Sequence, residues 1–399
     1  MERKGFGNVK LAWSPDDEAF RAELDTFLDA NTPPEAGSYD FLGETSDGVE
    51  LIPQWLRDWQ ATLFDHGWMI PAYPPELGGR NCTPVQTLIY LEELSTRRIP
   101  RATHFPGYAI VAPSLLEYGN EAQKELVPAA IRGDTIWCIG MSEPNAGSDL
   151  AGLQTRAAVH DDQFVVNGQK VWTSYATVAS KCFCYVRTDP AAPKHRGISL
   201  LIIDMDTPGI DVRPLRHING KADFAEVFFT DVEVPRENLV GALNGGWAIT
   251  QGSLAHERAG LWVEGVARLE QTVMGLVELA RRTGRDLDPT VRRRIAATFE
   301  NAASLRALGY KGFASFAQGS SAPEHSFMKM ATSEAGKAVF ELGMELCGPY
   351  GAVTDAELGE EAGRWVNSFF MSFANTIAGG SSEIQRNIIA QRVLGLPRK

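Results

Sequence analysis

The sequence has no apolar run long enough to span a bilayer, and its start, MERKGFGNVKLAW, holds no apolar stretch of signal-peptide length. We therefore expect a cytoplasmic protein that does not insert into a membrane. Basic residues are also few: 38 Lys and Arg stand against 50 Asp and Glu, a formal net charge of −12. This acidic balance argues against nucleic acid and anionic membranes as partners.

Cysteine is scarce as well. The five cysteines are odd in number and scattered: Cys82, Cys138, Cys182, Cys184 and Cys347. This pattern indicates neither a disulfide framework nor a metal site, and the seven histidines show no spacing typical of metal ligands. We expect reduced thiols and no bound metal.

The rest of the composition is typical of a globular chain of two or three domains, with 399 residues, 44% hydrophobic and 22% charged. The sequence of residues 14–134 has the pattern of helices with short breaks. The first begins after Ser14, a capping residue followed by a proline and two acids. A segment rich in Pro and Gly, residues 71–80, predicts a rigid loop. The other helices of this region are expected at 53–66, 84–97, 105–118 and 121–132.

From Ile136 the apolar pattern changes from a helical period to alternation, which predicts strands. Asn167-Gly168 stands between two strand-like runs, and this dipeptide predicts a two-residue hairpin because a type I′ turn needs φ > 0 twice. Further strands are expected at 181–186, 197–204, 210–214 and 225–234. Together they predict an antiparallel β domain.

After Gly245-Gly246 the helical period returns, and residues 247–282 predict one long helix. Three more helices are expected at 289–318, 322–346 and 360–376. Long helices with short links are typical of an antiparallel four-helix bundle. We thus predict an α+β fold with an N-terminal helical domain (1–135), a middle antiparallel β domain (136–240) and a C-terminal helical bundle (241–399).

Two turns are candidates for ligand binding. In the segment 135–150 an apolar run breaks at Ser142-Glu143-Pro144 into small residues, which expose backbone N–H groups able to cradle a phosphate or a polar heterocycle. In the segment 376–387, two glycines precede Ser381, which can cap a helix. Each pattern alone is also how ordinary strands end and ordinary helices begin.

Four motifs follow one another along the chain: MSEPNAGSD at 141–149, NGQKVWTS at 167–174, LAHERAG at 254–260 and IAGGSSEIQRNIIAQRVLGLPR at 377–398. With the helix–sheet–helix layout, they resemble the acyl-CoA dehydrogenase family over essentially the whole chain. The resemblance implies FAD bound between the β domain and the bundle, α,β-dehydrogenation of an acyl-CoA to the trans-2-enoyl-CoA, and usually a tetramer. It also implies a role in fatty acid or steroid side-chain catabolism.

The resemblance also assigns residues to the cofactor and the substrate. Met141 and Ser142 would meet the flavin ring, Gly147 and Ser148 the pyrophosphate, and Trp172 and Ser174 would flank the flavin from the neighbouring strand. Arg258 and Gly380 would lie by the substrate. The bundle residues that would hold FAD are Ser381, Ser382 and Glu383.

The reaction needs a carboxylate, shielded from water, that takes the proton from Cα. Many members of the family carry it one residue before the second glycine of the C-terminal motif, where this chain has Gly379. The family's other location is the long bundle helix, as in isovaleryl-CoA and long-chain type enzymes, and here it corresponds to Glu257. Leu254 and Leu261 lie on the same helix face, where a carboxylate is costly unless it is used or paired. The alternative for Glu257 is a salt bridge with Arg258 or another arginine.

Gly379 retains the backbone N–H that would polarise the thioester carbonyl and bind the developing enolate oxygen. Because glycine vacates side-chain volume, we expect room for a branched or ring-bearing acyl group. The sequence leaves the acyl group itself open.

Two stretches differ from the family's pattern. Residues 281–285, RRTGR, lack the phenylalanine of the arginine–phenylalanine pair that reaches a neighbouring subunit's FAD, and residues 345–351 differ from the usual glutamine–diglycine segment. The assembly expected is therefore a homotetramer or an α2β2 heterotetramer. The electron acceptor expected is an electron-transferring flavoprotein. Residues 194–196, KHR, are either a CoA phosphate contact or a solvated basic turn.

Other activities compete with dehydrogenation on this scaffold. A flavin monooxygenase needs no α-proton base, and a nitroalkane-type oxidase would let reduced flavin react directly with oxygen. A third alternative is a non-catalytic subunit that only binds a related chain.

Overall fold

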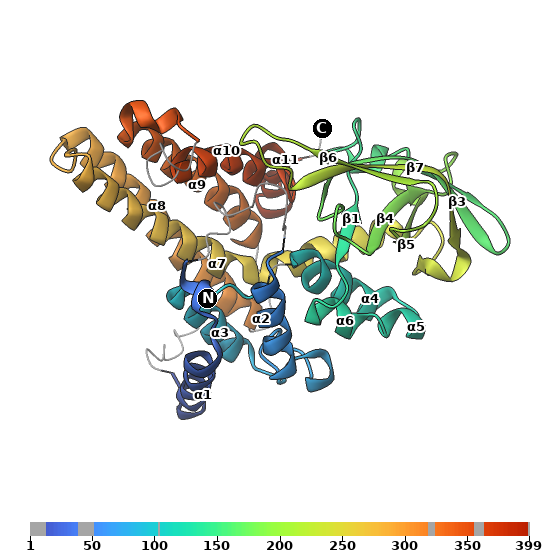
Figure 1. Ribbon diagram of the computed structural model, residues 1–399, viewed down its shortest axis with the longest axis horizontal. Coiled ribbons are helices and arrows are strands. Elements are labelled where there is room, and N and C mark those ends of the chain that lie inside the picture. Colours follow the sequence, from blue (N-terminus) through green and yellow to red (C-terminus); the bar gives the residue numbers. More distant parts are fainter. Residues whose placement is uncertain (1–12, 39–51, 103, 318–323, 355–362, 398–399) are drawn as a thin grey trace, which may run out of the picture.

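The computed structural model describes residues 13–38, 52–102, 104–317, 324–354 and 363–397, with the side chains of 251–261, 315–317 and 324–326 outside the description. It has three parts: N-terminal helices, a β sheet, and a helical bundle (Figure 1). The predicted order of helical domain, β domain and helical bundle is confirmed.

The N-terminal part is helical as predicted. Ser14 caps the first helix, because its hydroxyl accepts from Asp17 N while the Asp17 carboxylate accepts from Ser14 N. The helix expected at 105–118 begins with a π-helical turn, Gly107–Val111. The helices of this part are α1 (Pro15–Asn31), α2 (Gln54–Asp65), α3 (Pro84–Arg97), α4 (Ala112–Tyr118), α5 (Glu121–Lys124) and α6 (Val127–Arg132).

The middle part is a single sheet with the strand order β6-β7-β3-β2-β4-β5-β8, and β1 pairs with β4. Most neighbours are antiparallel, as predicted, but β1 runs parallel to β4 and β2 meets β4 in one parallel pair. The strands are β1 (Trp137–Gly140), β2 (Arg156–Val159), β3 (Gln163–Ser174), β4 (Lys181–Arg187), β5 (Ile198–Asp204), β6 (Ile210–Leu215), β7 (Phe224–Pro235) and β8 (Leu239–Val240).

The hairpin predicted at Asn167-Gly168 is wrong. Both residues lie inside β3, where the register against β7 shifts between Val166 and Gly168. The Asn167 amide donates to Asp231 of β7 at 3.0 Å and accepts from the Asp231 backbone at 2.9 Å. Because β3 pairs with β7 on both sides of this dipeptide, tertiary pairing outweighs the local turn preference and the extra residue becomes a β-bulge.

The C-terminal part confirms the helical bundle. The long helix α7 (Gly246–Arg282) runs from the sheet to the far end of the bundle (Figure 1). α7 also packs on α3 and on β5, so one helix contacts all three parts. The other helices are α8 (Pro289–Ala317), α9 (Glu324–Leu346), α10 (Arg364–Ile377) and α11 (Ser382–Ile388).

Two hydrophobic cores lie on opposite faces of the sheet. Alternate residues of β4 and β5, such as Phe183 and Leu200, face the core shared with the helices. Their neighbours, such as Cys184 and Leu201, face a second core between the strands. Because both faces of β4 and β5 are buried, most residues of these two strands are apolar. All five cysteines are free thiols.

His104 joins the N-terminal helices to the sheet. It is fully buried, and its Nε2 lies 2.7 Å from the carbonyl oxygen and 2.9 Å from the amide nitrogen of Trp137 in β1. Burial lowers the pKa of His104 to about 4, although its hydrogen bond to Trp137 acts in the opposite direction. The neutral imidazole is therefore the form that the folded protein holds.

We expect this histidine to make stability depend on pH. Since the pKa is depressed on folding, the unfolded chain binds the proton more readily, and stability falls as pH drops from about 6.5 towards 4. The loss at the low end is on the order of 3 kcal/mol. This loss of stability is measured by thermal unfolding of the wild type and of His104→Asn, each at pH 7.5 and at pH 5. An equal change in unfolding temperature for both proteins would contradict the assignment.

Candidate functional site

The turn after β1 exposes small residues, as the sequence analysis predicts. Glu143 and Ala146 close it through two backbone hydrogen bonds of 3.0 Å, N–H to carbonyl in each direction. Met141 and Ser142 are half-buried where the turn leaves the strand. Gly147 and Ser148 are exposed, and a Cβ added to Gly147 would meet no atom of the described residues within 4 Å. This side of the turn is thus open to a ligand.

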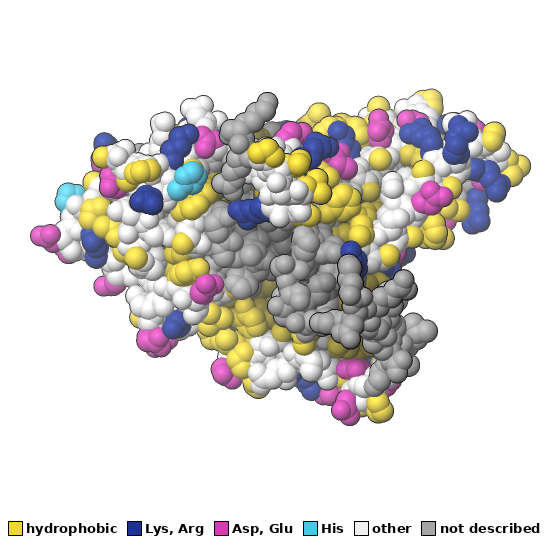
Figure 2. Space-filling model, turned by 180° about the vertical axis from the view of Figure 1, so that it is seen from behind, with side chains coloured by type: hydrophobic (Ala, Val, Ile, Leu, Met, Phe, Trp, Pro, Cys, Tyr) yellow, Lys and Arg dark blue, Asp and Glu magenta, His cyan; other side chains and the backbone are white. Residues whose placement is uncertain are grey.

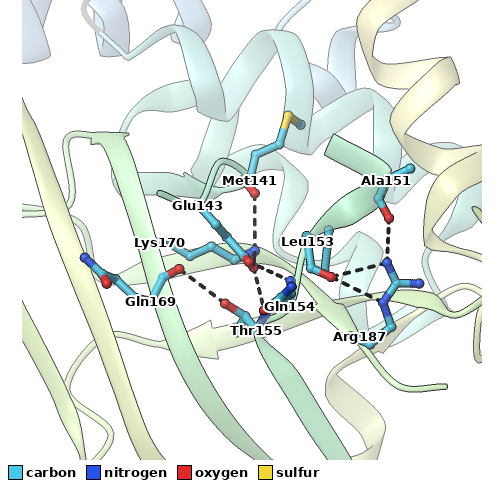
Figure 3. Close-up of polar contacts among 9 residues, drawn as sticks. All are labelled: Met141, Glu143, Ala151, Leu153, Gln154, Thr155, Gln169, Lys170 and Arg187. Carbon is cyan, nitrogen blue, oxygen red and sulfur yellow. Dashed lines mark hydrogen bonds and ion pairs between the residues drawn. The ribbon is translucent and has the colours of Figure 1, made fainter. Parts of the chain in front are cut away.

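A buried ion pair lies behind the turn. Lys170 Nζ is 2.8 Å from Glu143 Oε1 and donates to the carbonyl of Met141 at 3.2 Å (Figure 3). The same carboxylate accepts from the backbone N–H groups of Gln154 at 2.6 Å and Thr155 at 2.9 Å. The pair ties β3 to both ends of the loop between β1 and β2.

The charge state of Glu143 follows from these contacts. Burial alone would raise the pKa of its carboxyl group. The Lys170 ammonium and the hydrogen bonds from Lys170, Gln154 and Thr155 outweigh burial, so the pKa lies below its usual value. Glu143 is ionised in the folded protein at neutral pH.

A second β-bulge brings Trp172 next to this turn. Val171 N donates to the carbonyl of Ser142 at 2.9 Å, and the register of β3 against β7 shifts between Lys170 and Thr173. Trp172 adopts φ +59°, which is uncommon for a bulky residue, and 58% of it is exposed. The structure therefore brings together Met141, Ser142 and Trp172, three of the predicted cofactor residues.

An unpaired hydroxyl lies next to Trp172 in the chain. Ser174 is half-buried on β3, and Thr173 between them is buried, with its Oγ1 lacking any partner in the described part of the chain. The indole stands edge-to-face against Phe224, with ring centroids 6.0 Å apart. An exposed aromatic ring beside an unpaired hydroxyl fits a flat heterocycle with a polar edge, such as a flavin.

Arg187 anchors the other end of the same loop. Its guanidinium donates to the carbonyls of Ala151 at 2.6 Å and Leu153 at 3.2 Å (Figure 3). It also donates to the carbonyl of Lys194 at 2.7 Å. Lys194 pairs with Asp149 at 2.7 Å, so one residue of the basic turn 194–196 is engaged within the chain.

The sequence analysis missed Glu143, Lys170 and Arg187 as parts of this site. A signal existed for Lys170, because a charged residue occupies an inward position in an otherwise apolar alternation of β3. Nothing in the sequence identifies its partner.

The second group of predicted site residues lies in the diglycine turn between α10 and α11. Gly379 and Gly380 have φ of +65° and +94°, and a Cβ on Gly380 would lie 2.8 Å from Gln385 Nε2. The buried Gln385 side chain donates to the Gly379 carbonyl at 2.9 Å, and Lys329 of α9 donates to the Gly380 carbonyl at 2.8 Å. These contacts fix a turn that glycine favours.

The residues after the diglycine turn differ in exposure. The Ser381 hydroxyl caps α11 by accepting from Ile384 N at 3.4 Å. Ser382 is buried, and its hydroxyl donates to Glu334 of α9 at 2.6 Å. Glu383 is exposed, and its Oε1 lies 3.5 Å from Nη1 of Arg386. Both hydroxyls are thus used inside the bundle, while the Glu383 carboxylate is open to solvent.

Glu257 and Arg258 belong to α7, but their side chains lie outside the described residues. The helix that carries them packs on β5 of the sheet, and near its start the Trp247 ring lies edge-to-face against His195 of the turn 194–196, with ring centroids 4.6 Å apart. The helix after them enters the bundle core with Val263 and Val266. Position 257 therefore lies where α7 passes from the sheet to the bundle.

Within the described residues, no group of three His, Cys, Asp or Glu side chains is placed to hold a metal ion. The described helices include none that is long and apolar enough to cross a membrane.

Comparison with known families gives matches along nearly the whole chain. The domain models described as acyl-CoA dehydrogenase N-terminal, middle and C-terminal domain match residues 14–134, 138–232 and 244–394. The acyl-CoA dehydrogenase IpdE1 of Mycobacterium tuberculosis is 35% identical over 395 residues, covering 96% of this chain and 99% of that protein.

Solved structures give the same result. The Tcur3481-Tcur3483 steroid ACAD superimposes with a TM-score of 0.83 at 30% identity, covering 98% of this chain and 100% of that one. The ChsE4-ChsE5 complex from Mycobacterium tuberculosis superimposes with a TM-score of 0.80 at 30% identity, with the same coverage.

Proposed function

Because the chain belongs to the acyl-CoA dehydrogenase family and is thus an oxidoreductase, we propose that it binds FAD and dehydrogenates an acyl-CoA between Cα and Cβ. The observation that carries the proposal is the junction of Met141, Ser142 and Trp172, which two separate motifs build where β1 and β3 end. The product is the trans-2-enoyl-CoA.

The chain's own residues divide into those that hold the flavin and those that act on the substrate. Met141, Ser142, Trp172 and Ser174 would bind the flavin ring. From the bundle side, the contacts would come from Ser381, Ser382 and Glu383, with the Glu383 carboxylate the most open of the three. Gly147 and Ser148 would offer the open side of the turn to the pyrophosphate. When bound, FAD supplies the acceptor for the Cβ hydride.

Glu257 takes the Cα proton in this proposal. α7 carries it between the sheet and the bundle, and the position before Gly380 has no side chain that could serve instead. Gly379 would polarise the thioester carbonyl through its backbone N–H. Arg258 and Gly380 would lie beside the substrate.

We propose a bulky acyl group, branched or ring-bearing, as the substrate class. Around Gly379 there is room among the described residues: a Cβ added there would meet only Lys329 Cε of these, at 3.8 Å. One similar structure is described as a steroid ACAD, which supports a ring system.

The active assembly is proposed to be an α2β2 heterotetramer or a homotetramer, with an electron-transferring flavoprotein as electron acceptor. Two similar structures are described as pairs of different chains. The arginine-rich corner where α7 ends and α8 begins lies at the opposite end of the molecule from the sheet (Figure 1), and Lys and Arg side chains gather at that end (Figure 2). Arg281 and Arg282 would thus lie far from the FAD that the same chain binds at its sheet.

Anaerobic titration with a panel of CoA thioesters tests the proposal. The purified chain should be yellow, and a branched or ring-bearing acyl-CoA should bleach the flavin. Colourless protein would favour a non-catalytic partner subunit, and bleaching only by short straight-chain acyl-CoAs would overturn the substrate class. Reduced flavin that reacts rapidly with oxygen would favour a flavin monooxygenase or oxidase.

A further inference from the structure

Lys170 and Glu143 form the most buried ion pair among the described residues: 0% of the lysine side chain and 7% of the glutamate side chain are exposed. Neither charge faces the open side of the turn. Every strong polar contact of the pair goes to the backbone that carries the exposed residues, or to the partner charge (Figure 3).

The contacts are arranged around the loop that follows β1. Lys170 holds its start through the Met141 carbonyl, and Glu143 holds its end through the N–H groups of Gln154 and Thr155. Residues 142–148 lie between these two points, and four of them are exposed: Pro144, Asn145, Gly147 and Ser148. The next residues along β3 after Lys170 form the bulge that presents Trp172.

A stability role alone explains this arrangement poorly. Desolvating two charges costs as much as their attraction returns, so well-packed apolar residues often replace a buried ion pair without loss of stability. Apolar residues cannot hold in place the three backbone groups that the pair binds in two separate segments, the Met141 carbonyl and the N–H groups of Gln154 and Thr155.

We propose that Lys170 and Glu143 are a positioning pair for FAD, which fixes the turn at 141–148 against the Trp172 bulge. This inference rests on the proposed function. The pair touches neither flavin nor substrate. It acts through the backbone of Met141, Gln154 and Thr155.

The test compares the double variant Lys170→Met/Glu143→Met with the wild-type holoprotein. Removing both charges leaves no unpaired ion, so the sheet should fold and should lose less stability than it does with Lys170→Met alone. FAD should nevertheless dissociate at least about tenfold faster on dilution, the equivalent of one hydrogen bond to a charged group. Release is followed by the recovery of flavin fluorescence.

Lys181→Met/Asp204→Met is the matched control. This pair also joins a lysine to an acid across two strands of the same sheet, but it lies on β4 and β5 away from the turn. Its FAD release should equal that of the wild type.

The outcomes separate the two proposals. Wild-type protein without FAD would overturn the proposed function and this inference with it. Wild-type and double-variant proteins that release FAD at the same rate would overturn only the positioning role. If the double variant does not fold, Glu143→Gln decides: it keeps the shape of the side chain but lacks the charge, and it should release FAD faster with an altered flavin absorption band. If Glu143→Gln releases FAD at the wild-type rate, the inference is overturned.

Discussion

Glu257→Gln should lower the rate at which an acyl-CoA bleaches the flavin by about 10²–10⁴-fold, the usual contribution of a general base. The amide has nearly the shape of the carboxylate but cannot accept the Cα proton. FAD content should remain that of the wild type, because no proposed FAD contact is altered. Anaerobic stopped-flow spectroscopy at saturating acyl-CoA measures the rate of bleaching.

Glu270→Gln is the matched control for this experiment. Glu270 also lies on α7, but its carboxylate is held by Arg306 of α8. The control should bleach at the wild-type rate. Full activity of Glu257→Gln would contradict the assignment of the base and favour chemistry that needs no Cα proton acceptor, such as that of a flavin monooxygenase.

Lys170→Met alone should cause a large loss of stability in the β domain, about 3–5 kcal/mol. The substitution removes the counter-charge of Glu143 and leaves a carboxylate buried without compensation. Thermal unfolding followed by circular dichroism should show a decrease of several degrees at pH 8. The double variant with Glu143→Met should recover most of it, because no charge is then left in the core.

The loss should also depend on pH. In the wild type the pKa of Glu143 is depressed, so its contribution is present above the usual carboxyl pKa and is lost as pH falls through the lower folded value. Without Lys170, burial would raise this pKa, and the protonated acid would relieve the buried charge at low pH. The difference between wild type and Lys170→Met should therefore be smaller at pH 5 than at pH 8. A difference of equal size at both pH values would contradict this account.

The sequence by itself determined the order of the three parts and most of their elements. Ser14 with Asp17 marks a helix start through contacts within one turn, and the apolar period over residues 247–282 predicts α7 almost to the residue. These features depend on neighbours in the chain, which local patterns record. The two candidate turns were also found, because glycine and serine after an apolar run are visible without any partner.

Only the tertiary structure decided how distant segments meet. Asn167-Gly168 has the composition of a hairpin, yet pairing with β7 makes it a bulge inside a strand. Lys170 finds Glu143 across 27 positions of sequence, and β1 joins β4 in parallel. The physical reason is that a strand's register and the partner of a buried charge are fixed by long-range backbone pairing and desolvation, which depend on what lies alongside in space and leave little trace in the local sequence.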